Sequence, residues 1–147
     1  MDETEYRKTY HDVNPLSCPY EKAILCNRCA CSRAHRYYLA EREGVGCVSP
    51  AAHQRCEQLL QDMRSKAAFA LHTPTVEGRL PHAKALKVQI GGLLGLQAAM
   101  SGEPAEQVAD IHALIDAAER EYGGLDQLPY PLIMRTVVGF TARKRRR

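Results

Sequence analysis

The chain has 147 residues, of which 45% are hydrophobic and 25% are charged. This length suits a single domain with its own core, and this composition excludes a wholly disordered chain. Trp is absent and Phe occurs only twice, so the core must consist mainly of aliphatic side chains. The formal net charge is +3, but five of the 20 Lys and Arg residues form the C-terminal tail, and the remaining chain carries 15 basic against 17 acidic residues. Outside the tail, this balance argues against a nucleic-acid-binding domain.

The N-terminus shows no targeting signal. It reads Met1-Asp2-Glu3-Thr4-Glu5, which is acidic and is not followed by the apolar run of a secretory signal. The longest apolar stretch, Ile90 to Met100, is far shorter than the roughly 20 residues of a membrane span. We therefore expect a soluble, cytoplasmic protein.

The first third of the chain predicts short elements. Residues 1–16 read as an irregular arm that ends in an Asn-Pro turn signal. Ser17 and Pro19 favour a helix start, with the helix continuing to Cys26. A second helix is predicted from Ala34 to Glu43, because Gly44 follows as a stop signal.

The rest of the chain shows helical periodicity. The clearest helix begins at Ser49-Pro50 and carries an apolar stripe on one face. A loop is predicted from His72 to His82, between the first and second of four helices, which span about 50–71, 82–100, 101–122 and 132–142. Small residues at Gly91, Gly95 and Ala99 recur every four positions, which predicts the close approach of another helix.

These elements predict an all-α protein, a compact bundle of five or six helices with an N-terminal cysteine-rich segment that binds a metal or cluster. We expect one domain over residues 1–147. It comprises the irregular arm (1–16), a cysteine-rich metal-binding segment (17–56), a helical body (57–142) and a basic tail (143–147).

Every cysteine lies between Ser17 and Cys56, and the residues that follow contain none. In a reducing cytoplasm a dense group of cysteines indicates metal or redox chemistry rather than structural disulfides. All six are therefore candidate metal ligands: Cys18, Cys26, Cys29, Cys31, Cys47 and Cys56. Cys56 also lies on the apolar stripe of its helix, so burial in the core explains it about as well.

Zinc and iron–sulfur clusters normally take four protein ligands, and the spacing allows two sets of four. The first set is Cys26, Cys29, Cys31 and Cys47. The second set is Cys18, either Cys29 or Cys31, Cys47 and Cys56, and it would link three separate segments. His35 and His53 are weaker alternatives to a thiolate.

The central run is Cys26-Asn27-Arg28-Cys29-Ala30-Cys31. It resembles the start of the cluster motif in superoxide-sensing regulators of the MerR type, which implies an iron–sulfur cluster. The resemblance covers six residues, and the next cysteine lies further along the chain than in those regulators. Zinc remains the alternative metal, although only one Cys-x2-Cys pair is present where zinc ribbons usually have two.

We therefore expect a small iron–sulfur protein acting in electron transfer, redox sensing or metallocentre assembly. No catalytic motif is present, so we expect no enzymatic activity. The alternatives are a zinc-stabilised protein-interaction module and a nucleic-acid-associated regulator that uses the tail Arg143, Lys144, Arg145, Arg146 and Arg147. A protein partner is expected in each case, and no membrane partner.

Overall fold

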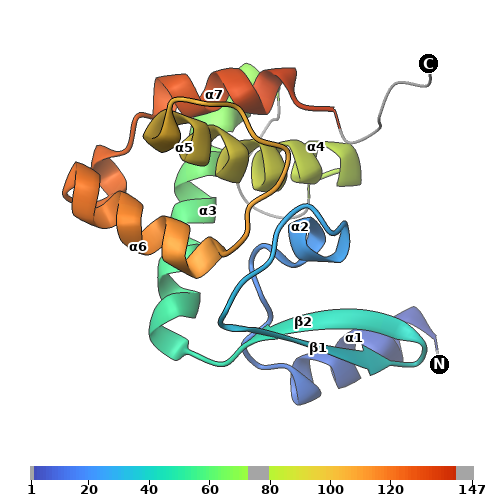
Figure 1. The fold of residues 1–147 in the computed structure, drawn as a ribbon. Helices are drawn as coiled ribbons and strands as arrows, with labels where there is room; N and C mark the ends of the chain where they lie inside the picture. The colour runs from blue at the N-terminus through green and yellow to red at the C-terminus, as the bar shows by residue number, and fades with distance from the viewer. Residues whose placement is uncertain (1, 73–79, 142–147) are drawn as a thin grey trace.

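The computed structural model describes residues 2–72 and 80–141. Most of the chain is helical, and a two-stranded hairpin lies at one end of the molecule (Figure 1). In chain order the elements are α1 (Glu3–Val13), α2 (Glu21–Leu25), β1 (Ala34–Leu39), β2 (Arg42–Cys47), α3 (Pro50–Ala70), α4 (His82–Leu86), the π-helical turn η1 (Lys87–Gly91), α5 (Gly92–Ser101), α6 (Ile111–Tyr122), the 3₁₀ turn η2 (Leu125–Gln127) and α7 (Tyr130–Gly139). Most of the predicted 72–82 loop and the basic tail Arg143–Arg147 lie outside the described residues.

The prediction of an all-α fold is wrong, because the predicted second helix is an antiparallel hairpin. Tyr37 and Tyr38 favour a strand over a helix. The hairpin turns at Ala40 and Glu41, which both have positive φ (50° and 66°), as the favoured two-residue turns require. Gly44 lies opposite Tyr37 in the register, and a Cβ atom there would be only 2.7 Å from Cζ of Tyr37. The glycine therefore makes room for an aromatic ring and does not end a helix.

The N-terminal arm is helix α1 rather than an irregular segment. The side chain of Asp2 caps this helix by accepting a hydrogen bond of 2.8 Å from the N–H of Glu5. Arg42 of the hairpin pairs with Glu3 at 3.0 Å, and its guanidinium lies 4.4 Å from the centre of the Tyr6 ring. Helix α1 thus packs along the hairpin (Figure 1).

The long helix is confirmed as α3. Ser49 caps it, since its side-chain oxygen accepts a hydrogen bond of 3.2 Å from the N–H of Ala52. The predicted apolar stripe faces the core through five buried residues: Ala52, Cys56, Leu59, Met63 and Ala67.

The small-residue stripe also has the predicted role of close helix packing. A Cβ atom on Gly95 would lie 2.9 Å from the carbonyl oxygen of Ile133, and one on Gly91 would lie 2.9 Å from Cα of Val137. Helices α5 and α7 lie side by side in Figure 1. Their backbones approach so closely that no side chain larger than hydrogen fits at these positions.

The third helix of the body begins later than predicted. Gly102 adopts a positive φ of 78° and ends α5, so the chain runs without helical structure until Asp110. Asp110 then caps α6 by accepting a hydrogen bond of 3.1 Å from the N–H of His112. The segment 102–110 is thereby left to pair with the cysteine-bearing part of the chain.

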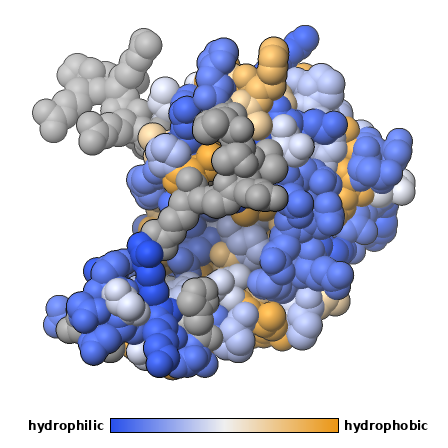
Figure 2. All heavy atoms as spheres, turned by 180° about the vertical axis from the view of Figure 1, so that it is seen from behind, coloured by the Kyte–Doolittle hydropathy of each residue, from blue (hydrophilic) through white to orange (hydrophobic). Residues whose placement is uncertain are grey.

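The surface seen from behind is mainly hydrophilic, with apolar side chains in scattered groups (Figure 2). In the part of the chain that the structure describes, no helix combines the length and the apolar character needed to cross a membrane.

Candidate functional site

Four of the six cysteines line one small cavity where the hairpin meets α3 and α6. They are Cys18, Cys31, Cys47 and Cys56. The enclosed space between them measures about 10 Å³. They come from four separate segments: the loop before α2, the loop before β1, the end of β2, and α3.

Backbone pairing with the hairpin brings Cys18 to Cys47. The N–H of Cys18 donates to the carbonyl of Val45 at 2.9 Å, and the N–H of Cys47 donates to the carbonyl of Leu16 at 2.8 Å. Residues 16–18 therefore act as a short third strand beside β2. This pairing holds both thiols on the same side of the hairpin's edge, at the cavity.

A second set of backbone bonds brings Cys31 to the N-terminus of α6. The N–H of Ala30 donates to Val108 at 3.0 Å, and Val108 donates back to Arg28 at 3.0 Å. The N–H of Ser32 donates to the carboxylate of Asp110 at 2.9 Å. The irregular stretch before α6 thus fixes the position of the Cys31 loop.

Cys56 completes the group from the buried face of α3, in the second turn of that helix. Apolar atoms fill much of the space around the thiols, and they come from Pro19, Ala34, Ala52 and Ile111. Such surroundings keep water away from the sulfur atoms and strengthen electrostatic interactions among the groups inside.

Burial raises the pKa of the Cys18 and Cys56 thiols to about 12, and it also raises the pKa of Cys31. Backbone N–H groups act in the opposite direction: that of Tyr20 on Cys18, and those of Arg33 and His112 on Cys31. The N–H of Arg33 lies 3.5 Å from Sγ of Cys31. These thiols are therefore protonated near neutral pH unless a cation displaces their protons.

The histidines at the cavity already have hydrogen-bond partners. His53 lines it, but its Nε2 lies 3.0 Å from the carbonyl of Ser17 and its Nδ1 lies 2.9 Å from the carboxylate of Glu57. His112 also lines the cavity, and its Nδ1 lies 3.2 Å from the guanidinium of Arg55. No sequence pattern singles out His112. His35 instead packs on the hairpin beside Tyr37.

The cysteines that line the cavity are those of the second predicted set, with Cys31 rather than Cys29. They are not those of the first set. Cys26 ends α2 and is exposed. Cys29 is buried, with only 4% of its surface exposed, where the backbone pairs with Val108. The central run therefore contributes only its last cysteine to the cavity.

The prediction of a metal-binding segment over residues 17–56 is not borne out by the geometry of the structure. Within residues 2–72 and 80–141, no group of three or more His, Cys, Asp or Glu side chains is arranged to hold a metal ion. The four thiols share a cavity, but their side chains are not gathered in ligand geometry. The site also depends on α3 and α6, which lie largely or wholly beyond the cysteine-rich segment.

Comparison with models of known protein families, with curated proteins and with solved structures found no match to this chain.

Proposed function

We propose that Cys18, Cys31, Cys47 and Cys56 bind an iron–sulfur cluster, and that the protein acts in electron transfer, redox sensing or metallocentre assembly. The observation that carries this proposal is that four cysteines from four separate segments line one small cavity. Four thiolates are the usual ligand set of such clusters. Binding requires the thiol side chains to rotate about their Cα–Cβ bonds towards a common centre.

The surroundings of the thiols support this assignment. Hydrogen bonds to the sulfur atoms and exclusion of solvent are the features by which proteins tune a cluster. Both are present, as the N–H of Arg33 at 3.5 Å from Sγ of Cys31 and as the apolar lining that includes Ile111.

A single zinc ion is the second candidate, and the size of the cavity favours it. A space of about 10 Å³ suits one ion better than a multi-iron cluster. The spacing of the four cysteines does not separate the two metals, because structural zinc sites and the common cluster motifs both contain closely spaced cysteine pairs, and no two of these four are that close in sequence. A zinc ion here would link the hairpin to α3 and support an interaction module.

The position of the site suits electron exchange with a protein partner. Cys18, Cys31 and Cys47 are each half-buried rather than fully enclosed, so a cluster bound here would lie close to the surface. We propose that the protein works in the cytoplasm, a reducing compartment in which thiols remain available for metals.

The test is anaerobic purification followed by an absorbance spectrum and by iron, sulfide and zinc analysis. We expect a brown protein with broad near-ultraviolet and visible absorbance that disappears in Cys18→Ser, Cys31→Ser, Cys47→Ser and Cys56→Ser. The control variant Cys26→Ser should keep the spectrum, because Cys26 lies outside the cavity. Colourless protein with one zinc per chain would replace the first candidate with the second. Protein that retains neither metal, even after reconstitution, would reject both.

A further inference from the structure

A second and much larger cavity, of about 750 Å³, lies where α2, α3, α4 and η1 face the N-terminal hairpin. Figure 2 shows the molecule hollowed between the hydrophilic hairpin region at the lower left and the helical body above it. This volume lies within the range of small-molecule sites, about 300–1,000 Å³. The cavity is separate from the cysteines, none of which lines it.

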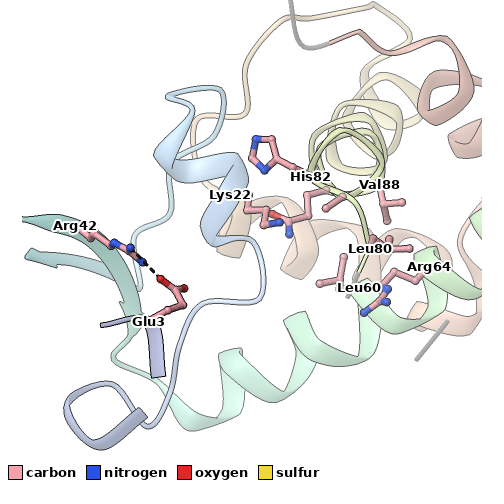
Figure 3. Close-up of a pocket in the computed structure, with 10 residues that line it drawn as sticks. Glu3, Lys22, Arg42, Leu60, Arg64, Leu80, His82 and Val88 are labelled. Atoms are coloured by element: carbon pink, nitrogen blue, oxygen red, sulfur yellow. Dashed lines mark ion pairs between the residues drawn. The ribbon is translucent and has the colours of Figure 1, made fainter. Parts of the chain in front are cut away.

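Basic side chains dominate the charge of this cavity. Lys22, Arg42 and Arg64 line it together with His82, and Glu3 is the one carboxylate among the lining residues that the structure describes. Glu3 is already paired with Arg42 at 3.0 Å, and this ion pair lies at one end of the cavity in Figure 3. Lys22, His82 and Arg64 lie towards the other end, on α2, α4 and α3 (Figure 3). Among the lining residues that the structure describes, that end holds three basic side chains and no carboxylate.

The same end also has an apolar wall. Leu60 and Leu80 line it together with Val88 of η1 (Figure 3). A ligand that contacts both this wall and the basic side chains has a hydrocarbon or aromatic body as well as an anionic group.

Gln89 adds a positioned polar group, although only 8% of its surface is exposed. Its Oε1 accepts a hydrogen bond of 3.2 Å from the N–H of Ala23, which fixes the orientation of the amide. Gln89 and Val88 both belong to the π-helical turn η1, and such turns occur frequently at functional sites. The turn places one apolar and one polar side chain at the cavity from consecutive positions.

From these observations we infer that the cavity binds a small organic anion, in which a carboxylate or phosphate contacts Lys22 and His82 and an apolar body lies against Leu60 and Val88. The lining combines apolar side chains with placed polar groups, as the sites of small-molecule ligands do. The inference does not depend on metal binding, because the two cavities share no lining residue.

The test measures the binding of octanoate and 2-naphthoate to the full chain by ligand-observed NMR and by calorimetry. These probes combine a carboxylate with an aliphatic or an aromatic body, and 1-octanol and inorganic phosphate each supply only one of the two features. We expect at least one carboxylate to bind more tightly than both single-feature compounds. Lys22→Gln and His82→Gln should each weaken binding about tenfold, the loss typical of one charged hydrogen bond.

Lys84→Gln is the matched control, since Lys84 lies on α4 but does not line the cavity, and it should leave the affinity unchanged. Circular dichroism separates loss of binding from loss of fold, and having two cavity variants keeps the test decisive if one of them unfolds. Absence of binding by both carboxylates at about 10 mM would overturn the inference. Equal binding of 1-octanol, or unchanged affinity in both cavity variants, would do the same.

Discussion

The N-terminal region (residues 2–49) and the helical body (residues 50–72 and 80–141) are stabilised in different ways. Among the twelve largest fully buried side chains of the described residues, only Tyr20 and Val45 belong to the N-terminal region. The others lie in the body, on α3, η1, α5, α6 and α7 and in the segment before α6. The N-terminal region instead relies on backbone pairing, aromatic contacts and three of the four cysteines at the small cavity. A region with so little core of its own is the part that a bound metal would stabilise most.

Of the changes considered, loss of one cavity cysteine should have the largest effect on stability. Cys47→Ser should abolish metal binding and lower the free energy of unfolding of the metal-loaded protein by more than about 3 kcal/mol. Cys26→Ser should change it by less than about 0.5 kcal/mol, because Cys26 is exposed. Urea unfolding of both variants gives the comparison. Equal effects would show that the cavity cysteines have no special role in stability.

The pH dependence of metal binding is the second prediction. Because burial raises the pKa of Cys18 and Cys56 to about 12, each thiol must release a proton to bind metal near neutral pH. The apparent affinity should therefore rise with pH, by about tenfold per pH unit for each proton released. Competition against a chelator of known affinity, between pH 6 and about 8, measures the slope. A flat profile would show that the thiols are already ionised or are not ligands.

Packing of the helical body can be perturbed without touching the N-terminal region. Gly95→Ala places a Cβ atom 2.9 Å from the carbonyl oxygen of Ile133, and such overpacking should cost about 1–3 kcal/mol. Gly139→Ala has open space around it and should be neutral or stabilising, by up to about 1 kcal/mol. Thermal unfolding of the two variants tests this difference. Metal content should stay the same in both.

Asp110 connects the two regions, and its loss should have the smallest effect. Asp110→Ala removes the cap of α6 and the acceptor for the N–H of Ser32, at a cost of about 0.5–2 kcal/mol. Burial alone would raise the pKa of Asp110, but hydrogen bonds from Ser32 and from the first turn of α6 outweigh it and lower the pKa.

A lowered pKa in the folded protein means that Asp110 contributes stability above its unfolded pKa of about 3.9 and loses it as the pH falls through the lower folded value. The difference in unfolding free energy between the native chain and Asp110→Ala should therefore shrink below about pH 4. Urea titrations at several pH values measure it. A difference that stays constant into strong acid would contradict this role for the carboxylate.

The sequence predicts the body better than the N-terminal region, for a physical reason. Helix α3 has a cap at Ser49 and a continuous apolar stripe, so local signals and tertiary packing agree. The hairpin turns at Ala40 and Glu41 instead of the Asn-Gly or Asp-Gly pairs that usually mark such turns, so its signal is absent from the sequence. Gly44 looks like the glycine that ends a helix, although in the structure it makes room for the Tyr37 ring.

The cysteine cavity was predictable only as one of two alternatives. Spacing identifies Cys18, Cys31, Cys47 and Cys56 as a possible set, but the choice depends on backbone pairing between residues far apart in sequence. The pairing of Cys29 with Val108, which turns Cys29 away and leaves Cys31 at α6, has no local signature. The basic cavity was not predicted at all, because its described lining residues come from six elements and the loop before α4, with no common motif.

Amide hydrogen exchange with and without bound metal tests most directly whether a metal at the four cysteines stabilises the N-terminal region. Removing the metal should increase exchange at the N–H groups of Cys18, Ala30 and Cys47, whose backbone bonds hold the cavity segments in place. Exchange in α5 and α7 should stay unchanged, because their packing does not involve the cavity. Equal deprotection of both regions, or no change in either, would contradict the account.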